Sequence, residues 1–406
     1  MSTEPDARLR VILLDSNGYA SYHDPRGASI LSADRYCVLL VTDTAKASQA
    51  TGAGLEAVVG IRGDDQARAG AVRFLYSLGG SDAIRLATVS ERLLLPAARI
   101  REELGIPGPT VAETLPFRDK ILMKQRLQAA GIRVPEFAEF SEESARRLAR
   151  SYRAVVVKPR LGTGAEDIFV LRGAAALDAF LASRSARAPA LEAEEHVSGP
   201  VCHVDSVVRE GNVVAATAGR YLDDTTAYKS LAPCRDVAVP DGALLDELLD
   251  FNQRVIACYP RFTGVTHHEM FLTDDGPCFC EIAARAGGGG VAAGFWSRTG
   301  TSLHQLVLQA QALEPVPRDI KVASHLTGWV MIYAGRGVLR APVQPPDAPW
   351  VIEARITARP GDRLRGPRSC GEGVALVSVS GADEAEVTSR LATVVEQCAP
   401  DVSPEE

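Results

Sequence analysis

The stretch from Thr266 to Gly290, which reads THHEMFLTDDGPCFCEIAARAGGGG, limits the possible folds of this chain more than any other segment. Two short runs, His267 to Leu272 and Cys278 to Ile282, flank a Thr-Asp-Asp-Gly-Pro segment. Asp, Gly and Pro between two such runs are typical of a tight turn. The stretch therefore predicts an antiparallel hairpin followed by a glycine-rich loop.

The predicted hairpin brings two acidic residues together, because side chains alternate between the faces of a strand. One face is expected to carry His267, Glu269, Phe271, Phe279, Glu281 and Ala283, and the other Met270, Leu272, Cys280 and Ile282. A turn centred on Asp275 places Glu269 opposite Glu281, with Cβ atoms roughly 4.5 to 5.5 Å apart, where like charges destabilise a sheet. A divalent cation removes this repulsion. Carboxylate oxygens and water suit Mg²⁺, with Mn²⁺ as an alternative.

Arg285 and the four glycines that follow it are a second candidate feature. An arginine can hold a carboxylate or phosphate through two parallel hydrogen bonds, and a glycine-rich turn exposes backbone N–H groups to an anion. Together they predict a site for a carboxylate or acyl phosphate beside the metal. The substrate contacts expected there are His267, Arg285, Gly287, Gly288 and Gly289. The competing interpretation of these residues alone is a solvent-exposed hairpin with surface glutamates and a flexible loop.

The composition is that of an ordinary globular protein. The 406 residues are 46% hydrophobic and 23% charged, and this length suggests roughly two to four packed units. The net charge of −7, without a dense Lys/Arg run, argues against nucleic acid as a partner. No apolar run approaches about 18 residues and no signal-peptide core opens the chain, so we expect a cytoplasmic protein without membrane contact. The eight cysteines form no CxxC pair, which predicts reduced thiols.

The N-terminal part of the chain alternates between predicted strands and helices. Leu9 to Leu14, Tyr36 to Thr42 and Leu55 to Ile61 are apolar runs typical of buried parallel strands. Helical patterns follow at Asp65 to Leu78 and Ser90 to Leu104. This alternation predicts a small doubly wound α/β domain, and the lack of a GxGxxG motif gives no support to dinucleotide binding.

Two lysines occupy positions that suit a phosphate. Lys120 opens a helix of strong helix formers, and a helix N-terminus attracts anions rather than cations. Lys158 ends the apolar strand AVVVK, beside a loop that contains Gly162 and Gly164. A point charge next to a pliable glycine loop is a phosphate-binding arrangement. The alternative for Lys120 is a surface lysine in a first helical turn.

In combination these motifs resemble the ATP-grasp superfamily. The resemblance rests on the Arg-Asp-Lys that opens the helix, the AVVVK strand with its glycine loop, the run LEAEEHVSG, and a Glu, an 11-residue gap, Glu-x-x-x-Arg and a glycine run. It implies ATP phosphate contacts through Lys120, Lys158, Gly162 and Gly164. Glu269 and Glu281 would hold the metal.

The same resemblance assigns roles to the run LEAEEHVSG and to the strand after it. It implies that Glu194, Glu195 and Val197 form the hinge that holds the adenine. His203 is a weaker candidate for contact with ribose, and a structural histidine is the competing interpretation.

A fold class and a domain order also follow from the resemblance. The expected fold is α/β and α+β, with a doubly wound α/β domain at residues 1–112 and an ATP-grasp module of two α+β subdomains at 113–315. A lid subdomain is expected at about 150–215. Residues 316–406 alternate at period two and end in a helix, which resembles the β-rich C-terminal lobe of some family members.

The implied chemistry is ATP-dependent activation of a carboxylate. The γ-phosphoryl group passes to the carboxylate, and an amine then displaces phosphate from the acyl phosphate to form an amide. The nearest branch is the L-amino-acid ligases that make dipeptides, so Arg285 and Lys158 are the expected catalytic residues. The expected partners are a small carboxylate and an amine, above all amino acids, and a homodimer is left open. The alternatives are a carboxyphosphate-type carboxylase and a nucleotide-binding protein without turnover.

Two departures from the family pattern bear on this interpretation. Ala283 stands where an Asn is common, which removes one metal ligand and favours the alternative without turnover. Ala165-Glu166-Asp167 replaces the usual Ser-x-Gly after the loop glycines, and it adds negative charge near the phosphates or offers contacts to a cationic substrate.

Overall fold

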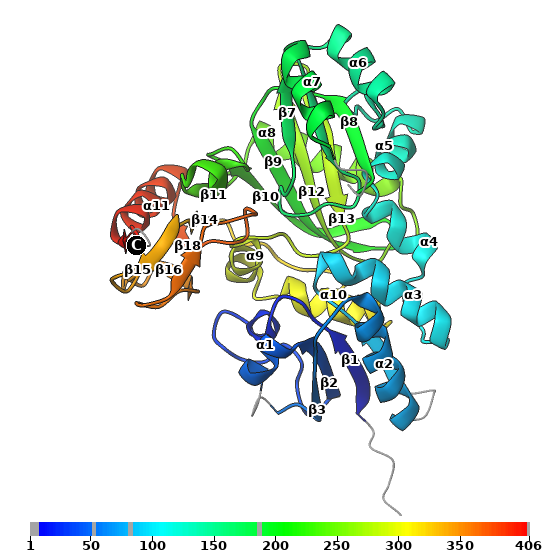
Figure 1. Ribbon diagram of the computed structural model, residues 1–406. Coiled ribbons are helices and arrows are strands. Elements are labelled where there is room, and N and C mark those ends of the chain that lie inside the picture. The colour runs from blue at the N-terminus through cyan, green and yellow to red at the C-terminus, as the bar shows by residue number, and fades with distance from the viewer. Residues whose placement is uncertain (1–7, 51–53, 80–83, 185–188, 404–406) are drawn as a thin grey trace, which may run out of the picture.

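The computed structural model describes residues 8–50, 54–79, 84–184 and 189–403, and within them the strands form four sheets (Figure 1). The N-terminal sheet is parallel and has the strand order β3-β2-β1-β4. Its elements are β1 (Leu9–Leu14), β2 (Tyr36–Asp43), β3 (Ala57–Ile61), α2 (Asp65–Gly79), β4 (Ile84–Ala87) and α3 (Leu94–Leu104). Apolar clusters cover both faces of this sheet, which explains why its strands read as continuous apolar runs.

An eight-stranded antiparallel sheet forms the centre of the molecule, with the order β13-β12-β9-β10-β11-β14-β18-β16. Its strands are β9 (Val201–Arg209), β10 (Asn212–Tyr221), β11 (Cys234–Ala238), β12 (Gly264–Thr273), β13 (Gly276–Ala283), β14 (Leu326–Ile332), β16 (Val351–Ile356) and β18 (Ala375–Gly381). The predicted hairpin is thus the β12–β13 edge, and the C-terminal strands extend the same sheet beyond β11.

The two faces of the large sheet differ in chemistry. Helices α8 (Ala243–Ala257) and α11 (Glu384–Gln397) cover one face through apolar side chains. Helices α9 (Val291–Thr299) and α10 (Leu303–Gln311) lie on the opposite face, and α10 also packs against the N-terminal sheet (Figure 1). This second face carries the buried polar side chains His203, Asp205, Asp236 and His267.

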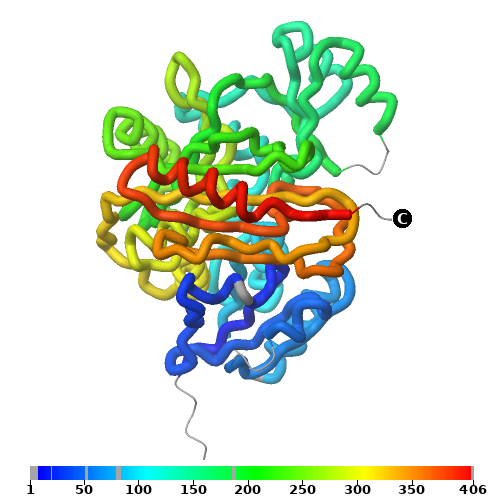
Figure 2. Tube along the Cα trace, turned by 90° about the vertical axis from the view of Figure 1, so that its left-hand side faces the viewer, coloured from blue at the N-terminus to red at the C-terminus, as the bar shows by residue number. Residues whose placement is uncertain are grey.

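A smaller four-stranded sheet lies above the hairpin in Figure 1, with the order β5-β8-β6-β7. Its elements are β5 (Phe137–Glu139), α6 (Glu142–Ser151), β6 (Ala154–Pro159), β7 (Phe169–Arg172), α7 (Gly173–Ser183) and β8 (Leu191–Glu195), preceded by α5 (Lys120–Ala129). The remaining sheet consists of β15 (Arg336–Leu339), β17 (Arg363–Arg365) and β19 (Val402–Ser403). Figure 2 shows α11 lying along the C-terminal strands, between the N-terminal part below and the smaller sheet above.

The hairpin contains a β-bulge that the sequence did not reveal. Thr273 pairs with Gly276, so the centre of the turn lies between Asp274 and Asp275, half a residue before the predicted centre at Asp275. With regular pairing from this turn, Cys280 would lie opposite Glu269. A register shift between Glu269 and Met270 makes Cys280 the extra residue and restores the pairing of Glu269 with Glu281.

The prediction of which hairpin residues share a face is therefore partly wrong. Phe279 does not lie beside Glu281, because it is fully buried in the apolar cluster that contains Met270 and Ile282. Between the turn and the bulge, the residues of β13 lie on the face opposite to the one predicted by simple alternation. From Glu281 to Ala283 the pairing is the predicted one.

The fold class agrees with the sequence prediction, since a parallel α/β sheet is followed by antiparallel sheets with helices. The predicted boundaries at residues 112 and 315, and the lid at about 150–215, stay predictions. Among the described residues, no helix is both long enough and apolar enough to cross a lipid bilayer.

Candidate active site

The two opposed glutamates lie on the polar face of the large sheet. Glu281 forms an ion pair with the Lys120 ammonium, with 2.9 Å between Nζ and Oε2. Glu269 accepts from the Tyr221 hydroxyl at 3.1 Å and from His267 Nε2 at 3.4 Å, both on Oε1. Burial acts to raise the pKa of Glu281, but the lysines Lys120 and Lys158 outweigh it and hold the pKa at about 2. The Glu281 carboxylate is therefore charged at neutral pH.

Lys158 is part of a buried cluster of two lysines and two glutamates. Its Nζ lies 2.6 Å from Glu194 Oε1 and 3.7 Å from Glu192 Oε1. The Lys124 ammonium lies 2.7 Å from Glu192 Oε2 and 2.5 Å from Glu194 Oε2. Burial acts to lower the pKa of Lys158, but the carboxylates, Glu194 first, raise it well above its usual value.

Sequence reasoning missed Lys124 and Glu192. Their signal was spacing: Glu192 lies two residues before Glu194 on the same strand face, and Lys124 lies one helical turn after Lys120. The Glu194 carboxylate pairs with both lysines, and its predicted contact with an adenine edge stays a prediction. Glu195 is the next residue of β8 and so points to the other face, and Val197 lies in the loop after that strand.

The glycine loop after β6 contacts several other parts of the chain. The Lys120 ammonium donates to the Gly162 carbonyl at 3.0 Å, and the Cys370 N–H donates to the Gly164 carbonyl at 3.1 Å. The tripeptide Ala165-Glu166-Asp167 replaces the usual family sequence in this loop, and its Glu166 forms an ion pair of 2.5 Å with Arg92. Its neighbours Ala165 and Asp167 have φ values of 55° and 53°, a strained conformation for residues other than glycine. The tripeptide therefore tethers the loop to the N-terminal part.

Arg285 lies beside a carboxylate that sequence reasoning also missed. Its Nε donates to Glu91 Oε2 at 2.5 Å, and its Nη1 donates to the Ala286 carbonyl at 2.6 Å. The second oxygen of Glu91 binds Arg118, whose Nη2 also donates to the Leu161 carbonyl at 2.5 Å. Burial acts to lower the pKa of Arg285, but Glu91 raises it overall. Glu91 follows the carboxyl end of β4, where open α/β sheets place their ligand-contacting residues.

The glycine run packs closely against the polar face of the sheet. The Gly287 N–H donates to Asp205 Oδ1 at 3.2 Å, and a Cβ at this position would lie 2.7 Å from the same oxygen. A Cβ at Gly289 would lie 2.7 Å from the Trp329 ring, whereas one at Gly288 would meet nothing within 4 Å. Close approach thus explains Gly287 and Gly289, and it also holds for Gly290, where a Cβ would lie 2.4 Å from the Trp329 Cβ. Their role in substrate binding stays a prediction.

Both histidines named from the sequence are buried on this face. His203 Nδ1 lies 2.6 Å from Asp205 Oδ2, and His267 Nδ1 lies 2.9 Å from Asp205 Oδ1. Since each ring is held by a carboxylate, the structural interpretation of His203 gains support. His267 contacts both Asp205 and Glu269, so it lies directly behind the opposed glutamates.

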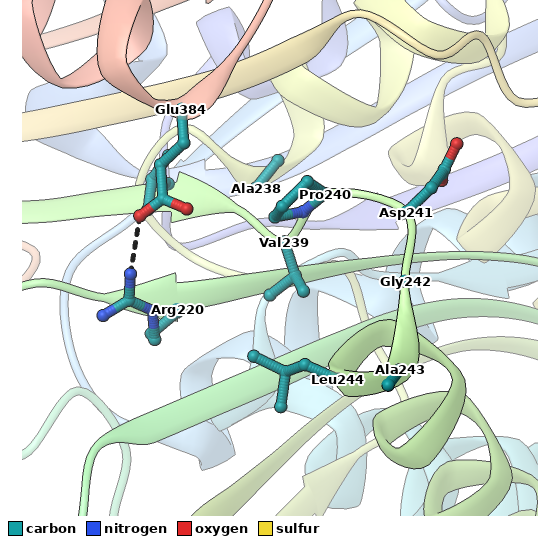
Figure 3. Close-up of a pocket in the computed structure, with 10 residues that line it drawn as sticks. Arg220, Ala238, Val239, Pro240, Asp241, Gly242, Ala243, Leu244 and Glu384 are labelled. Atoms are coloured by element: carbon teal, nitrogen blue, oxygen red, sulfur yellow. Dashed lines mark hydrogen bonds and ion pairs between the residues drawn. The ribbon is translucent and has the colours of Figure 1, made fainter.

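A cavity of about 250 Å³ lies on the other face of the sheet, at the start of α8 (Figure 3). Arg220 and Glu384 form an ion pair of 2.7 Å at its edge. Arg220 follows Gly219, which pairs with His203, so the Arg220 side chain points away from the polar face. This cavity is therefore separate from the clustered charged residues, which are the better candidate for an active site.

Comparison with known proteins agrees with this geometry. Residues 117–289 match a family model described as an ATP-grasp domain. The chain is 22% identical over 330 residues to the L-arginine-specific L-amino acid ligase of Bacillus subtilis, covering 76% of this chain and 78% of that protein.

Two solved structures share the fold. The structure of an L-amino acid ligase from Bacillus licheniformis has a TM-score of 0.78 at 18% identity, over 98% of this chain and 100% of that chain. A carboxyaminoimidazole ribonucleotide synthase from Aspergillus clavatus, solved with ATP, has a TM-score of 0.71 at 15% identity, over 97% of this chain and 100% of that chain.

Proposed function

We propose that this chain, which contains an ATP-grasp domain over residues 117–289, is an ATP-dependent ligase that joins a carboxylate to an amine. The observation that carries the proposal is the convergence of charged groups on one face of a sheet. Two opposed carboxylates, Glu269 and Glu281, lie with Lys120, Lys158 and Arg285 around them. Phosphoryl transfer needs little covalent chemistry from a protein, and such a cluster supplies the positioning and electrostatics it does need.

The two glutamates fit a hard divalent cation such as Mg²⁺. In the described part of the chain, the contacts of these carboxylates fall on Oε1 of Glu269 and Oε2 of Glu281, so one oxygen of each is available as a ligand. When bound, Mg²⁺ would neutralise phosphate oxygens and stabilise the charge that develops in transfer. Ala283 offers no ligand atom. The remaining ligands would come from water and nucleotide.

The ATP phosphates would lie against Lys120, Lys158 and the glycine loop of Gly162 and Gly164. Lys120 already bridges Glu281 and the Gly162 carbonyl, so it can draw the loop toward the metal side of the site. Since Glu194 is engaged by lysines, we assign recognition of the adenine to backbone groups near Glu195 and Val197. His203 is assigned a role outside the nucleotide site.

The substrate carboxylate would bind Arg285. Glu91 fixes the guanidinium through Nε, and the Ala286 carbonyl takes one N–H of Nη1, which leaves three of the five N–H donors for an anion. Arg118, held by the other oxygen of Glu91, stands beside it. These residues would orient the carboxylate for phosphoryl transfer and then hold the acyl phosphate while the amine attacks.

Amino acids are the substrates that we propose. Support comes from the curated relative, which is named as an L-arginine-specific L-amino acid ligase. A carboxylase that acts through carboxyphosphate is the second candidate, because the carboxyaminoimidazole ribonucleotide synthase shares the fold.

A substrate screen separates these candidates. We would measure ADP and phosphate release with Mg²⁺ and ATP across pairs of amino acids, with and without bicarbonate. A ligase releases ADP only when a competent acid and amine are both present. Release that requires bicarbonate would identify a carboxylase, and ATP binding without any release would contradict both enzymatic proposals.

Lys158→Ala is expected to raise the KM for ATP and to lower kcat. A charge-assisted hydrogen bond to phosphate is worth about 1.5–3 kcal/mol, and it should strengthen as charge develops in the transition state. Steady-state kinetics of ADP release test this expectation. Lys120→Ala should show the same changes, less severely.

Lys124→Ala is the matched control for Lys158→Ala. Both substitutions remove a partner of the buried glutamates Glu192 and Glu194, so both should lower the melting temperature. Only Lys158 also lies near Glu281, on the metal side. Equal kinetic losses in the two variants would mean that Lys158 acts through stability alone.

A further inference from the structure

A line of hydrogen-bonded acids and histidines crosses the polar face of the large sheet and ends at Glu269. His203 Nε2 lies 3.0 Å from Asp236 Oδ2, and His203 Nδ1 lies 2.6 Å from Asp205 Oδ2. The other oxygen of Asp205 accepts from His267 Nδ1 at 2.9 Å, and His267 Nε2 lies 3.4 Å from Glu269 Oε1. We refer to Asp236, His203, Asp205 and His267 as the acid–histidine chain.

Strand register explains why these side chains meet. In the pairing of β9 with β12, His203 is opposite Glu269, and Asp205 is opposite His267. In β11, Asp236 is the partner of Tyr221, two residues beyond the Gly219 that pairs with His203. A side chain at Gly219 would collide with the His203 ring, since a Cβ there would lie 2.4 Å from Nε2. The missing side chain lets His203 reach Asp236 across β10.

The charges of the acid–histidine chain alternate. Both nitrogens of each ring face a carboxylate oxygen, so each ring can donate to two carboxylates as an imidazolium. The four groups are at most 4% exposed. Alternating opposite charges are what makes their burial tolerable.

The chain reaches one oxygen of Glu269 and leaves the other available. Oε1 accepts from His267 and from the Tyr221 hydroxyl, whereas within the described residues no contact is found for Oε2. A carboxylate held by two donors on one oxygen cannot rotate freely. Its second oxygen is then the one left for a cation, on the residue that pairs with Glu281 across the hairpin.

We propose that the acid–histidine chain, together with Tyr221, is a buried brace that orients the Glu269 carboxylate for a divalent cation. The inference rests on the proposed metal-binding role of Glu269 and Glu281. Hydrogen-bond partners behind a metal ligand commonly change metal affinity by about 10–100-fold, because they set the orientation of the ligand before the metal arrives. These residues are positioning residues: they act through Glu269.

The donor atoms of His203, Asp205 and His267 lie within 4.8 Å of one another, which raises the question of a metal among them. Both ring nitrogens of each histidine and both oxygens of Asp205 already take part in hydrogen bonds, of 2.6 Å to 3.4 Å. The Gly287 N–H also donates a hydrogen bond to Asp205 Oδ1. A metal would have to displace this whole set of bonds. We therefore assign the cluster to the support of Glu269.

The test is binding of Mn²⁺ to the full-length protein in the presence of a non-hydrolysable ATP analogue, with free Mn²⁺ measured by electron paramagnetic resonance. Asp205→Asn removes the charge that holds both histidines and keeps the side-chain shape. We expect its Kd for Mn²⁺ to rise about 10–100-fold. An Asp205→Asn protein that is folded and binds Mn²⁺ with the wild-type Kd would overturn the proposal.

Tyr221→Phe gives a second measurement if Asp205→Asn does not fold. It removes one donor from Glu269 Oε1 without any change of charge, and we expect about a tenfold rise in the Kd for Mn²⁺. His268→Gln is the matched control. His268 is the neighbour of His267, but it points to the opposite face, where its Nδ1 bonds Asn252 at 3.0 Å. The Kd for Mn²⁺ of this variant should not change. A rise in this Kd equal to that of Asp205→Asn would mean that any buried substitution in this region weakens binding of Mn²⁺.

Glu269→Gln distinguishes failure of the brace from failure of the proposed metal site. If Glu269→Gln binds Mn²⁺ with the Kd of the wild type, the metal assignment is wrong, and the proposed brace is then wrong too. If Glu269→Gln weakens binding while Asp205→Asn and Tyr221→Phe do not, the metal site stands and the brace alone is wrong.

Discussion

Glu281→Gln is expected to abolish turnover while the protein stays folded. The substitution removes one of the two opposed carboxylates and, with it, the charge that would hold the cation and that pairs with Lys120 at 2.9 Å. The fold should survive because loss of one carboxylate also relieves the repulsion between Glu281 and Glu269. The measurements are ADP release at saturating Mg²⁺ and the far-ultraviolet circular dichroism of the variant. Glu269→Gln should behave in the same way.

Asp275→Asn is the matched control for this prediction. It neutralises an acidic residue of the same hairpin whose side chain is 88% exposed at the turn, far along the strands from Glu281. Turnover should remain at the wild-type level. Activity of Glu281→Gln with normal dependence on Mg²⁺ would rule out the metal assignment, and equal inactivity of both variants would point to a damaged hairpin instead.

The opposition of Glu269 and Glu281 could be predicted from sequence, although the reasoning contained two errors that cancelled. The turn is centred half a residue earlier than expected, and the bulge at Cys280 shifts the register back by the same amount. A bulge depends on which side chains the core can accept, and here the core takes Phe279 together with Met270. Alternation within a single strand carries no information about such a tertiary choice.

The residues that support the lysines and Arg285 could not be predicted in the same way. Glu91 lies 194 positions before Arg285 in the sequence, and the two meet only because the N-terminal sheet packs against the large sheet through α10. Lys124 and Glu192 were within reach of local spacing arguments. A charged residue in a helix or a strand is nevertheless usually solvated, so spacing alone did not single them out.

The order of elements was easier to predict than their assembly. The strand Leu9–Leu14 has the predicted bounds, and α2 (Asp65–Gly79) differs from its prediction by one residue. Apolar periodicity sets these limits locally. The continuation of the large sheet from β11 into β14 joins residues about 95 positions apart, and periodicity cannot specify such a pairing.

Arg285→Lys is expected to leave ATP binding intact and to lower the rate of ligation by about 10²-fold or more, the scale of losing one preorganised oxyanion donor. Glu91 and the Ala286 carbonyl hold the guanidinium from one side and leave a planar set of donors on the other. An ammonium group can replace the charge of Arg285. It cannot bond Glu91 and at the same time present two parallel N–H groups to a carboxylate.

The measurements are equilibrium binding of ATP and ADP release with a competent acid and amine at saturating ATP. Arg133→Lys, an exposed change near the hairpin turn, is the control and should retain wild-type rates. Glu91→Gln extends the test, because it keeps the Arg285 guanidinium and weakens its support, together with that of Arg118. If Arg285 clamps the carboxylate, Glu91→Gln should raise the KM for the acid and cost less than Arg285→Lys. If Arg285→Lys instead loses ATP binding but ligates normally at saturating ATP, Arg285 acts on the nucleotide, and Arg118, on the other oxygen of Glu91, becomes the candidate for the carboxylate.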